Sequence, residues 1–509
     1  MTKLPKRFPI YFSLLLAFII CCRVLWIQHG WITNDSILYF EMARHLSEGN
    51  FATAHAVEGY TWGFYPALIG VVHAASGWDL QTSANLLIII FFMLLVWGLM
   101  RMVSIAGGNE WMQFYAVLLL LGSAYITGNI LPMASRDLGY WAMTVHAVNQ
   151  LILFYQHGFK RHAFYWQVLI LIATLFRIEG AIQFLVLPLA GFFILHPVSG
   201  NLKRIAAPYT LLIVGGLLAP VVLWSMHTGL DDLGRVKDIF TGIKDIELNF
   251  TRNLTHRVDV MREAVIGEAF EEYSWFSFLL IYFSITTIKC FSVAGWAPIL
   301  LVFAEKNAIK KGVQPIAYKV LLFWLFVSWV IGCLITFKVN LLSARYVALF
   351  GIVLIVFASF ALHRLLQQRT HIALAKKLLF ILSVVILSAG LIGNVKSKSP
   401  DFYYEIDAVQ YIQSRLATGQ KALYSSAKQR FYAKAAYDGR TDYDWEYLAT
   451  LMSDGRIQQY TYIIIKFDDT PEEHSKLEDF QRKLDGFKLE KTFYGHKSKK
   501  QLLVFKRTD

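Results

Sequence analysis

The sequence predicts an α-helical, polytopic membrane protein that ends in a small extracytoplasmic α/β domain. Three observations support this fold class. Of the 509 residues, 56% are hydrophobic and 17% are charged, and the mean hydropathy is +0.45, which is too apolar for an ordinary soluble protein. The apolar residues come in long runs, each near the roughly 20 residues that a helix needs to cross a bilayer. These runs end near residue 395, and the composition changes over residues 396–509.

About eleven runs are predicted to be membrane spans, with roughly 17–25 residues per span as the template. They are 9–28, 84–100, 112–130, 138–157, 163–180, 181–197, 206–227, 273–304, 319–337, 346–363 and 376–394. The run from Ser274 to Ala304 is long for one span and short for two, and we expect one span with an interfacial or re-entrant lead-in. The first run has basic flanks and no small-residue cleavage site after it, so we expect a retained anchor.

The basic residues predict the orientation in the membrane. They gather in alternate loops, at Arg101, Lys160, Arg161, Lys203, Arg204, Lys306, Lys310, Lys311, Arg364, Arg369, Lys376 and Lys377. By the positive-inside rule these loops are cytoplasmic, and an odd number of spans then leaves the C-terminus outside. We therefore expect a multi-pass protein of the plasma (inner) membrane, with a transmembrane domain at 1–395, outer loops at 29–83 and 228–272, and an extracytoplasmic (periplasmic) domain at 396–509.

Two outer segments have patterns of their own. Residues 228–272 carry charges of both signs and are predicted to form amphipathic helix at the interface, which could act as a lid. The C-terminal domain alternates predicted helices with short β-rich runs. The helices are 404–416 and 471–484, and the strands are 421–424, 460–466, 489–493 and 502–505. No glycine-rich phosphate loop, metal cluster or nucleophile elbow is evident there, so we expect a scaffold or an acceptor-docking domain.

Charge and cysteine content exclude two other classes of protein. The net charge is +13, but the excess lies in loops between apolar runs, where orientation requires it, and we expect no nucleic-acid partner. All four cysteines lie inside apolar runs, so neither a disulfide framework nor a cysteine zinc site is predicted.

The loop that follows the first span carries the first candidate for chemistry. Asp35 stands at the head of an amphipathic segment, and it has two interpretations. With Asn34 and Ser36 it could cap a helix, a contribution of about 1 kcal/mol. Alternatively, a partly shielded carboxylate can accept a proton from a hydroxyl as a general base. The apolar positions of the segment, expected on the membrane surface, are Ile37, Phe40, Met42, Ala43 and Leu46.

A second set of candidates could bind a substrate. Glu58 is either a solvated loop acid or part of the site, together with Tyr60. Several basic residues lie at the outer ends of predicted spans, against the positive-inside rule. Either a local ion pair or a bound phosphate would explain their position. Arg136 has Asp137 beside it and Arg177 has Glu179 nearby, whereas Lys338 and Arg345 have no neighbouring acid in sequence. We therefore favour a bound phosphate for Lys338 and Arg345. Tyr346, directly after Arg345, is included in the same set.

The loop also resembles a known family. The segments that carry the resemblance are Asn34-Asp35-Ser36-Ile37-Leu38, Ala43-Arg44-His45-Leu46, Glu48-Gly49, Val57-Glu58-Gly59-Tyr60-Thr61, Tyr65-Pro66-Ala67-Leu68 and Gly77-Trp78-Asp79-Leu80. They are similar to the first-loop signature of the glycosyltransferase-C (GT-C) superfamily. The similarity is greatest to bacterial polyprenyl-phosphate-sugar enzymes, including arabinofuranosyltransferases, and looser to protein O-mannosyltransferases and lipid A aminoarabinose transferases.

The resemblance implies transfer of a sugar from a polyprenyl monophosphate to a glycan, lipid or protein acceptor outside the membrane, usually with inversion. It implies Asp35 as the catalytic base. Two features depart from the family. The paired acids common at this place are here Asn34-Asp35, which weakens the case for a divalent metal, so no cofactor is expected although a metal stays an alternative. Phe64-Tyr65-Pro66 replaces a Lys-Pro-Pro that would contact phosphate.

Three alternatives remain open from the sequence. The first is a transporter or flippase of lipid-linked sugars, which would need repeated halves or discontinuous helices at the midplane. The second is a polymerase or ligase that uses polyprenyl-diphosphate glycans. The third is a non-catalytic assembly protein.

Overall fold

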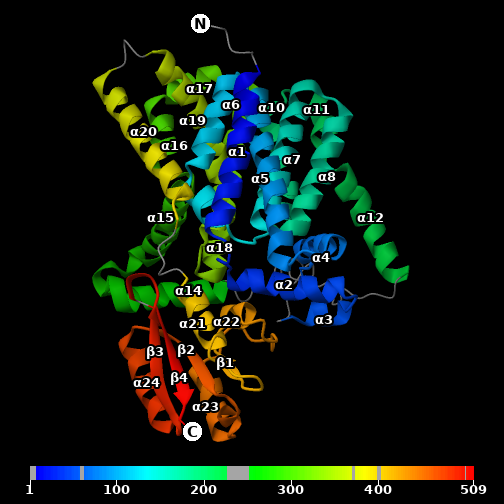
Figure 1. The fold of residues 1–509 in the computed structure, drawn as a ribbon. Coiled ribbons are helices and arrows are strands. Elements are labelled where there is room, and N and C mark those ends of the chain that lie inside the picture. The colour runs from blue at the N-terminus through cyan, green and yellow to red at the C-terminus, as the bar shows by residue number, and fades with distance from the viewer. Residues whose placement is uncertain are drawn as a thin grey trace. The chain divides into compact units, whose positions relative to one another are not determined.

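The computed structural model describes residues 7–57, 62–225, 251–368, 373–397, 403–498 and 500–508. The chain forms two compact units. The helical unit comprises residues 1–24, 86–131 and 135–395, and the second unit comprises residues 25–85, 132–134 and 396–509. The order of their elements along the chain can be followed by colour in Figure 1.

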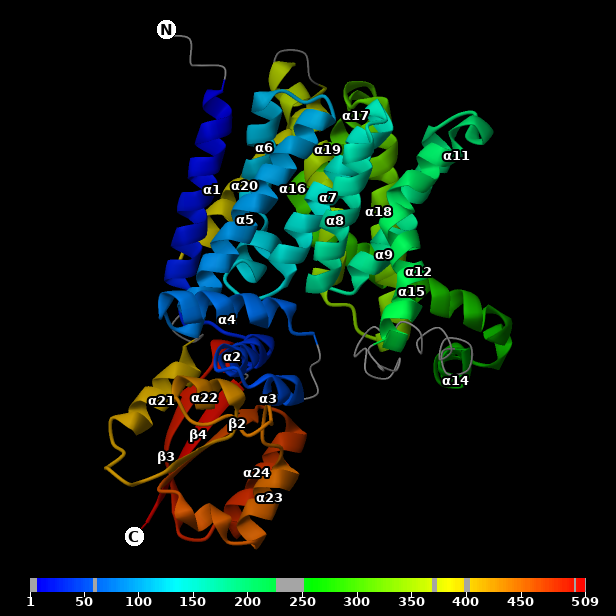
Figure 2. The same ribbon diagram turned by 90° about the vertical axis from the view of Figure 1, so that its right-hand side faces the viewer.

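The helical unit contains most of the predicted spans. Its elements are α1 (Phe8–Ile27), α5 (Leu80–Ile105), α6 (Glu110–Leu121), η2 (Ala124–Ile130), α7 (Asp137–His157), α8 (Lys160–Phe176), α9 (Glu179–Val186), η3 (Leu187–Leu189), α10 (Ala190–Ile194), α11 (Val198–Ala206), η4 (Ala207–Tyr209), α12 (Thr210–Ser225), α14 (Thr251–Met261), η7 (Arg262–Ile266), η8 (Glu268–Tyr273), α15 (Ser274–Ala294), α16 (Trp296–Ala304), α17 (Lys306–Gly312), α18 (Pro315–Val339), η9 (Ala344–Val347), α19 (Ala348–Gln367) and α20 (Leu374–Val395). α7 and α8 pack side by side, as Figures 1 and 2 both show.

Six helices among the described residues are long and apolar enough to cross a membrane. They lie at Phe8–Ile27, Leu80–Ile105, Ala269–Ala294, Pro315–Val339, Ala344–Gln367 and Leu374–Val395, and the bent pair α6–η2 would be a seventh. Other predicted spans correspond to α7, α8, the α9–α10 series and α12, which are helical but shorter or more polar. The predicted number of eleven spans therefore stays a prediction.

The α6–η2 span is bent by 54° between the two helices, whereas the sequence predicts one continuous span at 112–130. A break in a membrane helix frees backbone carbonyls, which must find donors inside the protein. Asn394 of α20 is the donor here, since its Nδ2 donates to Leu121 O at 2.8 Å and to Ser123 O at 3.1 Å. A side chain at Gly390 would collide with the backbone of Gly122, so α20 reaches the break only because both residues are glycine. The bend is therefore built into the packing.

The run from Ser274 to Ala304 is also divided. α15 ends at Ala294, and Gly295 has a positive φ of 80°, which glycine adopts without strain. α16 then begins at Trp296 and has only 9 residues, too few to cross a bilayer. The run thus contains one helix long enough to span, as expected, but the short segment follows this helix and does not lead into it. Of the predicted amphipathic loop at 228–272, α14 is a helix with one buried residue, Val258, while 228–250 lies outside the described residues.

The second unit contains a four-stranded mixed sheet with strand order β1-β2-β4-β3. Its strands are β1 (Ala422–Tyr424), β2 (Tyr462–Asp468), β3 (Phe487–Tyr494) and β4 (Lys500–Arg507). β1 and β2 are parallel, and the other two pairs are antiparallel. The helices of the tail are α21 (Tyr404–Gln413), α22 (Ala427–Tyr432), α23 (Trp445–Ser453) and α24 (Pro471–Lys483). The predicted strands and the helices α21 and α24 are confirmed, whereas α22 and α23 were not predicted.

The loop that follows the first apolar helix belongs to the same compact unit as this sheet. It forms α2 (Asn34–Ser47), α3 (Phe51–Ala56) and α4 (Phe64–Ser76). Phe40 of α2 stacks on Phe431 of α22 with 5.4 Å between ring centroids, and the Tyr403 hydroxyl donates to Ile27 O at 2.7 Å. The hydroxyl of Tyr432 donates to Gly30 O. Loop and tail, which the sequence analysis treated as parts of separate domains, therefore pack together (Figure 2).

Replacing Asn394 with leucine tests the origin of the bend. The variant keeps the side-chain size but leaves two buried carbonyls without a donor, at about 1–3 kcal/mol each. We expect a lower melting temperature for the purified protein. Ser383→Ala on the same helix removes only a hydrogen bond within α20 and is the matched control. Equal melting temperatures for the two variants would contradict this explanation.

Candidate functional site

Asp35 lies in the first turn of α2, but it is not the cap of that helix. Thr33 is the N-cap residue, since its Oγ1 accepts from the Ser36 backbone N–H at 3.2 Å, and Ser36 Oγ accepts from the Thr33 backbone N–H at 3.2 Å. This reciprocal pair is a capping box. The capping interpretation of Asp35 is therefore wrong. Asp35 is instead a half-buried acid in the first turn, at the positive end of the helix dipole.

The apolar face of α2 is buried in protein, and the prediction that it lies on the membrane surface is wrong for most of its residues. Ile37, Phe40, Met42 and Ala43 are almost fully buried, and only Leu46 is partly exposed. Tyr39 of α2 also meets Tyr65 of α4 edge to face, at 5.4 Å between ring centroids. A helix packed on one face and capped at its start holds its first turn rigidly. Asp35 thus has a fixed position within the second unit.

A cluster of charged side chains is buried in the helical unit. The guanidinium of Arg177, whose side chain is 2% exposed, donates from Nη2 to Glu179 Oε1 at 2.7 Å and from Nε to Glu179 Oε2 at 3.3 Å. Its Nη1 donates to Asp137, which is 1% exposed and also accepts from the Ser135 hydroxyl. Removing one member of such a buried ion group leaves an uncompensated charge in the interior. Arg177 therefore joins the start of α7 to the α8–α9 junction.

The backbone explains how Arg177 comes to this place. α8 ends at Phe176, Arg177 is extended (φ −148°, ψ 131°), and α9 starts at Glu179. The predicted span 163–180 therefore stops short of its expected end. A side chain at Gly180 would collide with Thr174, so the tight return into α9 needs glycine there. The local pairing of Arg177 with Glu179 that the sequence offered as an alternative to phosphate is the one observed, and Asp137 is an added partner.

Tyr346 links this ion group to Arg345. The Tyr346 ring lies 4.5 Å from Arg177 Cζ and 5.7 Å from Arg345 Cζ, both in cation–π geometry. Arg136 and Arg345 lie within electrostatic range of Asp137. Three arginines thus lie around two carboxylates, Asp137 and Glu179. Guanidinium groups gathered at one place present the paired donors that match phosphate oxygens.

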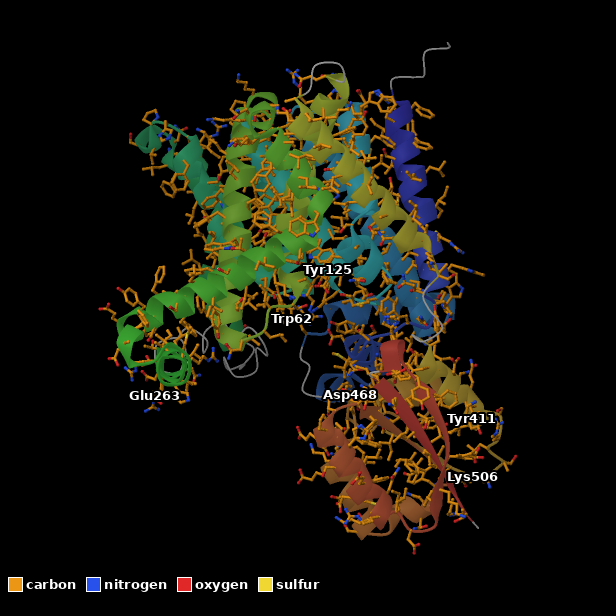
Figure 3. All side chains as sticks on the ribbon, turned by 90° about the vertical axis from the view of Figure 1, so that its left-hand side faces the viewer. Trp62, Tyr125, Glu263, Tyr411, Asp468 and Lys506 are labelled. Carbon is orange, nitrogen blue, oxygen red and sulfur yellow. The ribbon has the colours of Figure 1, made fainter. Side chains whose placement is uncertain are left out.

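Sequence reasoning missed two tyrosines of the cluster. Tyr125, marked in Figure 3, lies on the π-helical segment η2 and interacts with Ser343 and Arg345. Tyr140 lies under Arg177, with 5.9 Å from Cζ to the ring centroid. π-Helical turns occur frequently at functional sites, but they rarely leave a pattern in the sequence. The available indication was the dipeptide Gly122-Ser123, which interrupts an apolar run just before Tyr125.

The remaining predicted residues lie elsewhere. Arg136 is half-buried directly before α7. Lys338 is exposed in the last turn of α18, and no contact within the described part of the chain joins it to the arginine cluster. Glu58 and Tyr60 lie outside the described residues. Across the described ranges, no three His, Cys, Asp or Glu side chains are grouped so that they could hold a metal ion.

The second unit also contains a polar cavity of about 160 Å³. Its walls come from the segment just before α2 and from α21, α22, β2 and β4. The lining residues are Trp31, Ile32, Tyr404, Glu405, Ile406, Lys428, Tyr432, Lys466 and Lys500. Two of the three amines are paired with acids, since Lys428 Nζ lies 3.8 Å from Glu405 and Lys466 Nζ lies 3.5 Å from Asp442. Aromatic faces beside paired amines and carboxylates suit a hydroxylated ligand.

The sequence matches no protein-family model and no curated protein. The fold is similar to that of the Archaeoglobus fulgidus oligosaccharyltransferase in its apo crystal structure. The alignment covers 92% of this chain and 70% of that chain, with a TM-score of 0.52 and 11% sequence identity. At this identity the likeness shows a shared fold. The chain therefore shares the overall fold of that structure.

Two substitutions separate the cap of α2 from its first-turn acid. Thr33→Ala removes the side chain that accepts from Ser36, and we expect a loss of about 1 kcal/mol in the free energy of unfolding of the second unit. Asp35→Asn keeps the cap intact and should change this free energy by less. Denaturant unfolding of both variants measures the difference. A larger loss for Asp35→Asn than for Thr33→Ala would restore the capping role of Asp35.

The buried ion group predicts a strong effect of Arg177→Ala. The variant leaves Asp137 and Glu179 buried without their partner, at about 3–5 kcal/mol in the free energy of unfolding. Arg262→Ala removes an exposed pair with Asp259 (3.2 Å) and should cost at most about 1 kcal/mol. Thermal denaturation in detergent compares the two. If Arg177→Ala were as stable as this control, the ion group would have no structural role.

Proposed function

We propose that the chain is a membrane glycosyltransferase that transfers a sugar from a polyprenyl-monophosphate donor to an acceptor hydroxyl on the extracytoplasmic face. The supporting observation is the combination of an oligosaccharyltransferase-like fold with a rigidly held carboxylate, Asp35, in the first outer loop. The GT-C resemblance of that loop independently implies the same chemistry. The expected orientation would put Asp35 and the C-terminal domain on the outer side.

Each group has a role in the proposed reaction. The acceptor hydroxyl gives its proton to the Asp35 carboxylate as its oxygen attacks the anomeric carbon. The bond from that carbon to the phosphate oxygen breaks, and polyprenyl phosphate leaves. A single displacement of this kind inverts the anomeric configuration. The phosphate is already a competent leaving group, so the protein mainly positions the reactants and stabilises the charge that grows on the leaving oxygen.

Arg345 and Arg136 are the residues we propose for the donor phosphate. Arg177 is fully engaged by Asp137 and Glu179, and its role is to position the cluster rather than to bind phosphate. Tyr346 would hold Arg345 in place through its ring. The gathering of guanidinium groups beside Tyr346 and Asp137 supports this assignment, because paired guanidinium donors match phosphate oxygens. The polar cavity of the second unit supports acceptor binding, since it has room for a group about the size of one sugar ring.

Asp35→Asn tests the base. We expect the variant to bind the donor normally and to transfer sugar about two to four orders of magnitude more slowly, because the proton acceptor is lost while the shape is kept. Glu41→Gln on the same helix is the matched control, since its carboxylate is paired with Arg44 at 2.6 Å and is given no part in the reaction. Labelled polyprenyl-phosphate sugar measures turnover. Near-normal turnover of Asp35→Asn would exclude Asp35 as the base.

Arg345→Ala tests the phosphate site. A charge-assisted hydrogen bond contributes about 1.5–3 kcal/mol, so the Kd for the donor should rise about 10- to 150-fold. Arg345→Lys keeps the charge but not the paired donors. Its Kd for the donor should lie between those of Arg345→Ala and the wild type. Equilibrium binding of labelled donor gives both values. An unchanged Kd for Arg345→Ala would remove this residue from the donor site.

A further inference from the structure

A second cavity, of about 310 Å³, lies in the helical unit between the ends of three helices. It is formed by the start of α6, the C-terminal part of α17 and the last turns of α19. Its lining residues are Met112, Ala308, Lys311, Gly312, Phe360, His363, Arg364 and Gln367. None of them belongs to the proposed reaction, so the cavity is independent of the proposed function.

The cavity is basic. Lys311 from α17 and Arg364 from α19 both line it, and both side chains are exposed and able to turn toward a ligand. Among the described residues, the lining contains no carboxylate. Glu305, just before α17, is already paired with Lys376 at 2.6 Å. Two cations that converge on one cavity from different helices, with no acid in its walls, form a place for an anion.

The polar groups between the two cations add hydrogen-bond donors. His363 Nε2 lies 2.9 Å from Gln367 Nε2 and 3.3 Å from Asn109 Nδ2. The two amide nitrogens can only donate, so in this arrangement Nε2 accepts and the proton of the neutral ring is on Nδ1. His363 is therefore held by its neighbours while its Nδ1–H is left as a donor. A phosphate oxygen is an acceptor that matches such donors.

The position along the helices indicates where the anion comes from. α19 is a candidate span and α6 is the first half of the bent one, so the cavity lies at helix ends, where lipid headgroups are found. Met112 and Phe360 give it apolar walls that an acyl chain can contact. A basic loop that only sets orientation needs no cavity and no apolar wall. We infer that this cavity binds the phosphate of an anionic phospholipid headgroup.

The test compares lipids and variants of the full-length protein in detergent. Phosphatidylglycerol is the anionic probe, phosphatidylcholine the neutral one and inorganic phosphate the soluble one. Each cation near a lipid phosphate contributes about fivefold in affinity, so Lys311→Ala/Arg364→Ala should weaken phosphatidylglycerol binding about 25-fold. Lys310→Ala/Lys377→Ala is the matched control, because these exposed lysines lie outside the lining and their loss removes the same charge. Native mass spectrometry gives the affinities.

The inference requires that only the cavity variant loses phosphatidylglycerol, at an unchanged melting temperature. Equal losses in the two double variants would show a general charge effect and overturn it. So would wild-type binding of phosphatidylcholine as tight as that of phosphatidylglycerol. Displacement of the lipid by inorganic phosphate at millimolar concentration would identify a site for the free anion and would also overturn it.

Discussion

The helical unit depends on the ion group formed by Arg177 with Asp137 and Glu179. These charges are almost completely removed from water, which is costly unless each finds its partner at close range. The group therefore fixes the start of α7 relative to the junction of α8 and α9. Through the ring of Tyr346 it also fixes the residues that precede α19. Arg345 is the next residue along that segment, so a buried structural ion group holds a cation that the proposed reaction needs.

In the second unit, too, the residues that stabilise the structure differ from the residue proposed for the reaction. Thr33 and Ser36 form the cap of α2, and the buried face of the helix packs on α4 and α22. Asp35, two residues after this N-cap, lies in the first turn of the helix. The first loop packs on the C-terminal tail, which supports the helix that carries the proposed base and contributes most of the lining of the polar cavity.

Features that depend on the length of apolar runs and on the alternation of apolar and polar residues could be predicted from the sequence. The apolar runs located most helices of the first unit, and alternation located the four strands to within a few residues. The sequence could not predict the breaks at Gly122 and Gly295, because these depend on the approach of α20 and on a glycine backbone that fits equally well in a turn elsewhere. The sequence indicated Glu179 as a partner of Arg177 but gave no indication of Asp137, which is 40 residues away. The amphipathic face of α2 fits a membrane surface and a protein surface equally, and only packing decides between them.

The most direct measurement follows both halves of a labelled donor in a single experiment. Purified protein in liposomes receives a polyprenyl-phosphate sugar labelled in the sugar and in the phosphate, with an envelope glycan extract as acceptor. A glycosyltransferase releases one polyprenyl phosphate for each sugar transferred, and the new glycosidic bond has the inverted anomeric configuration. Movement of intact donor across the bilayer without release of polyprenyl phosphate would contradict the proposed reaction and identify a transporter instead.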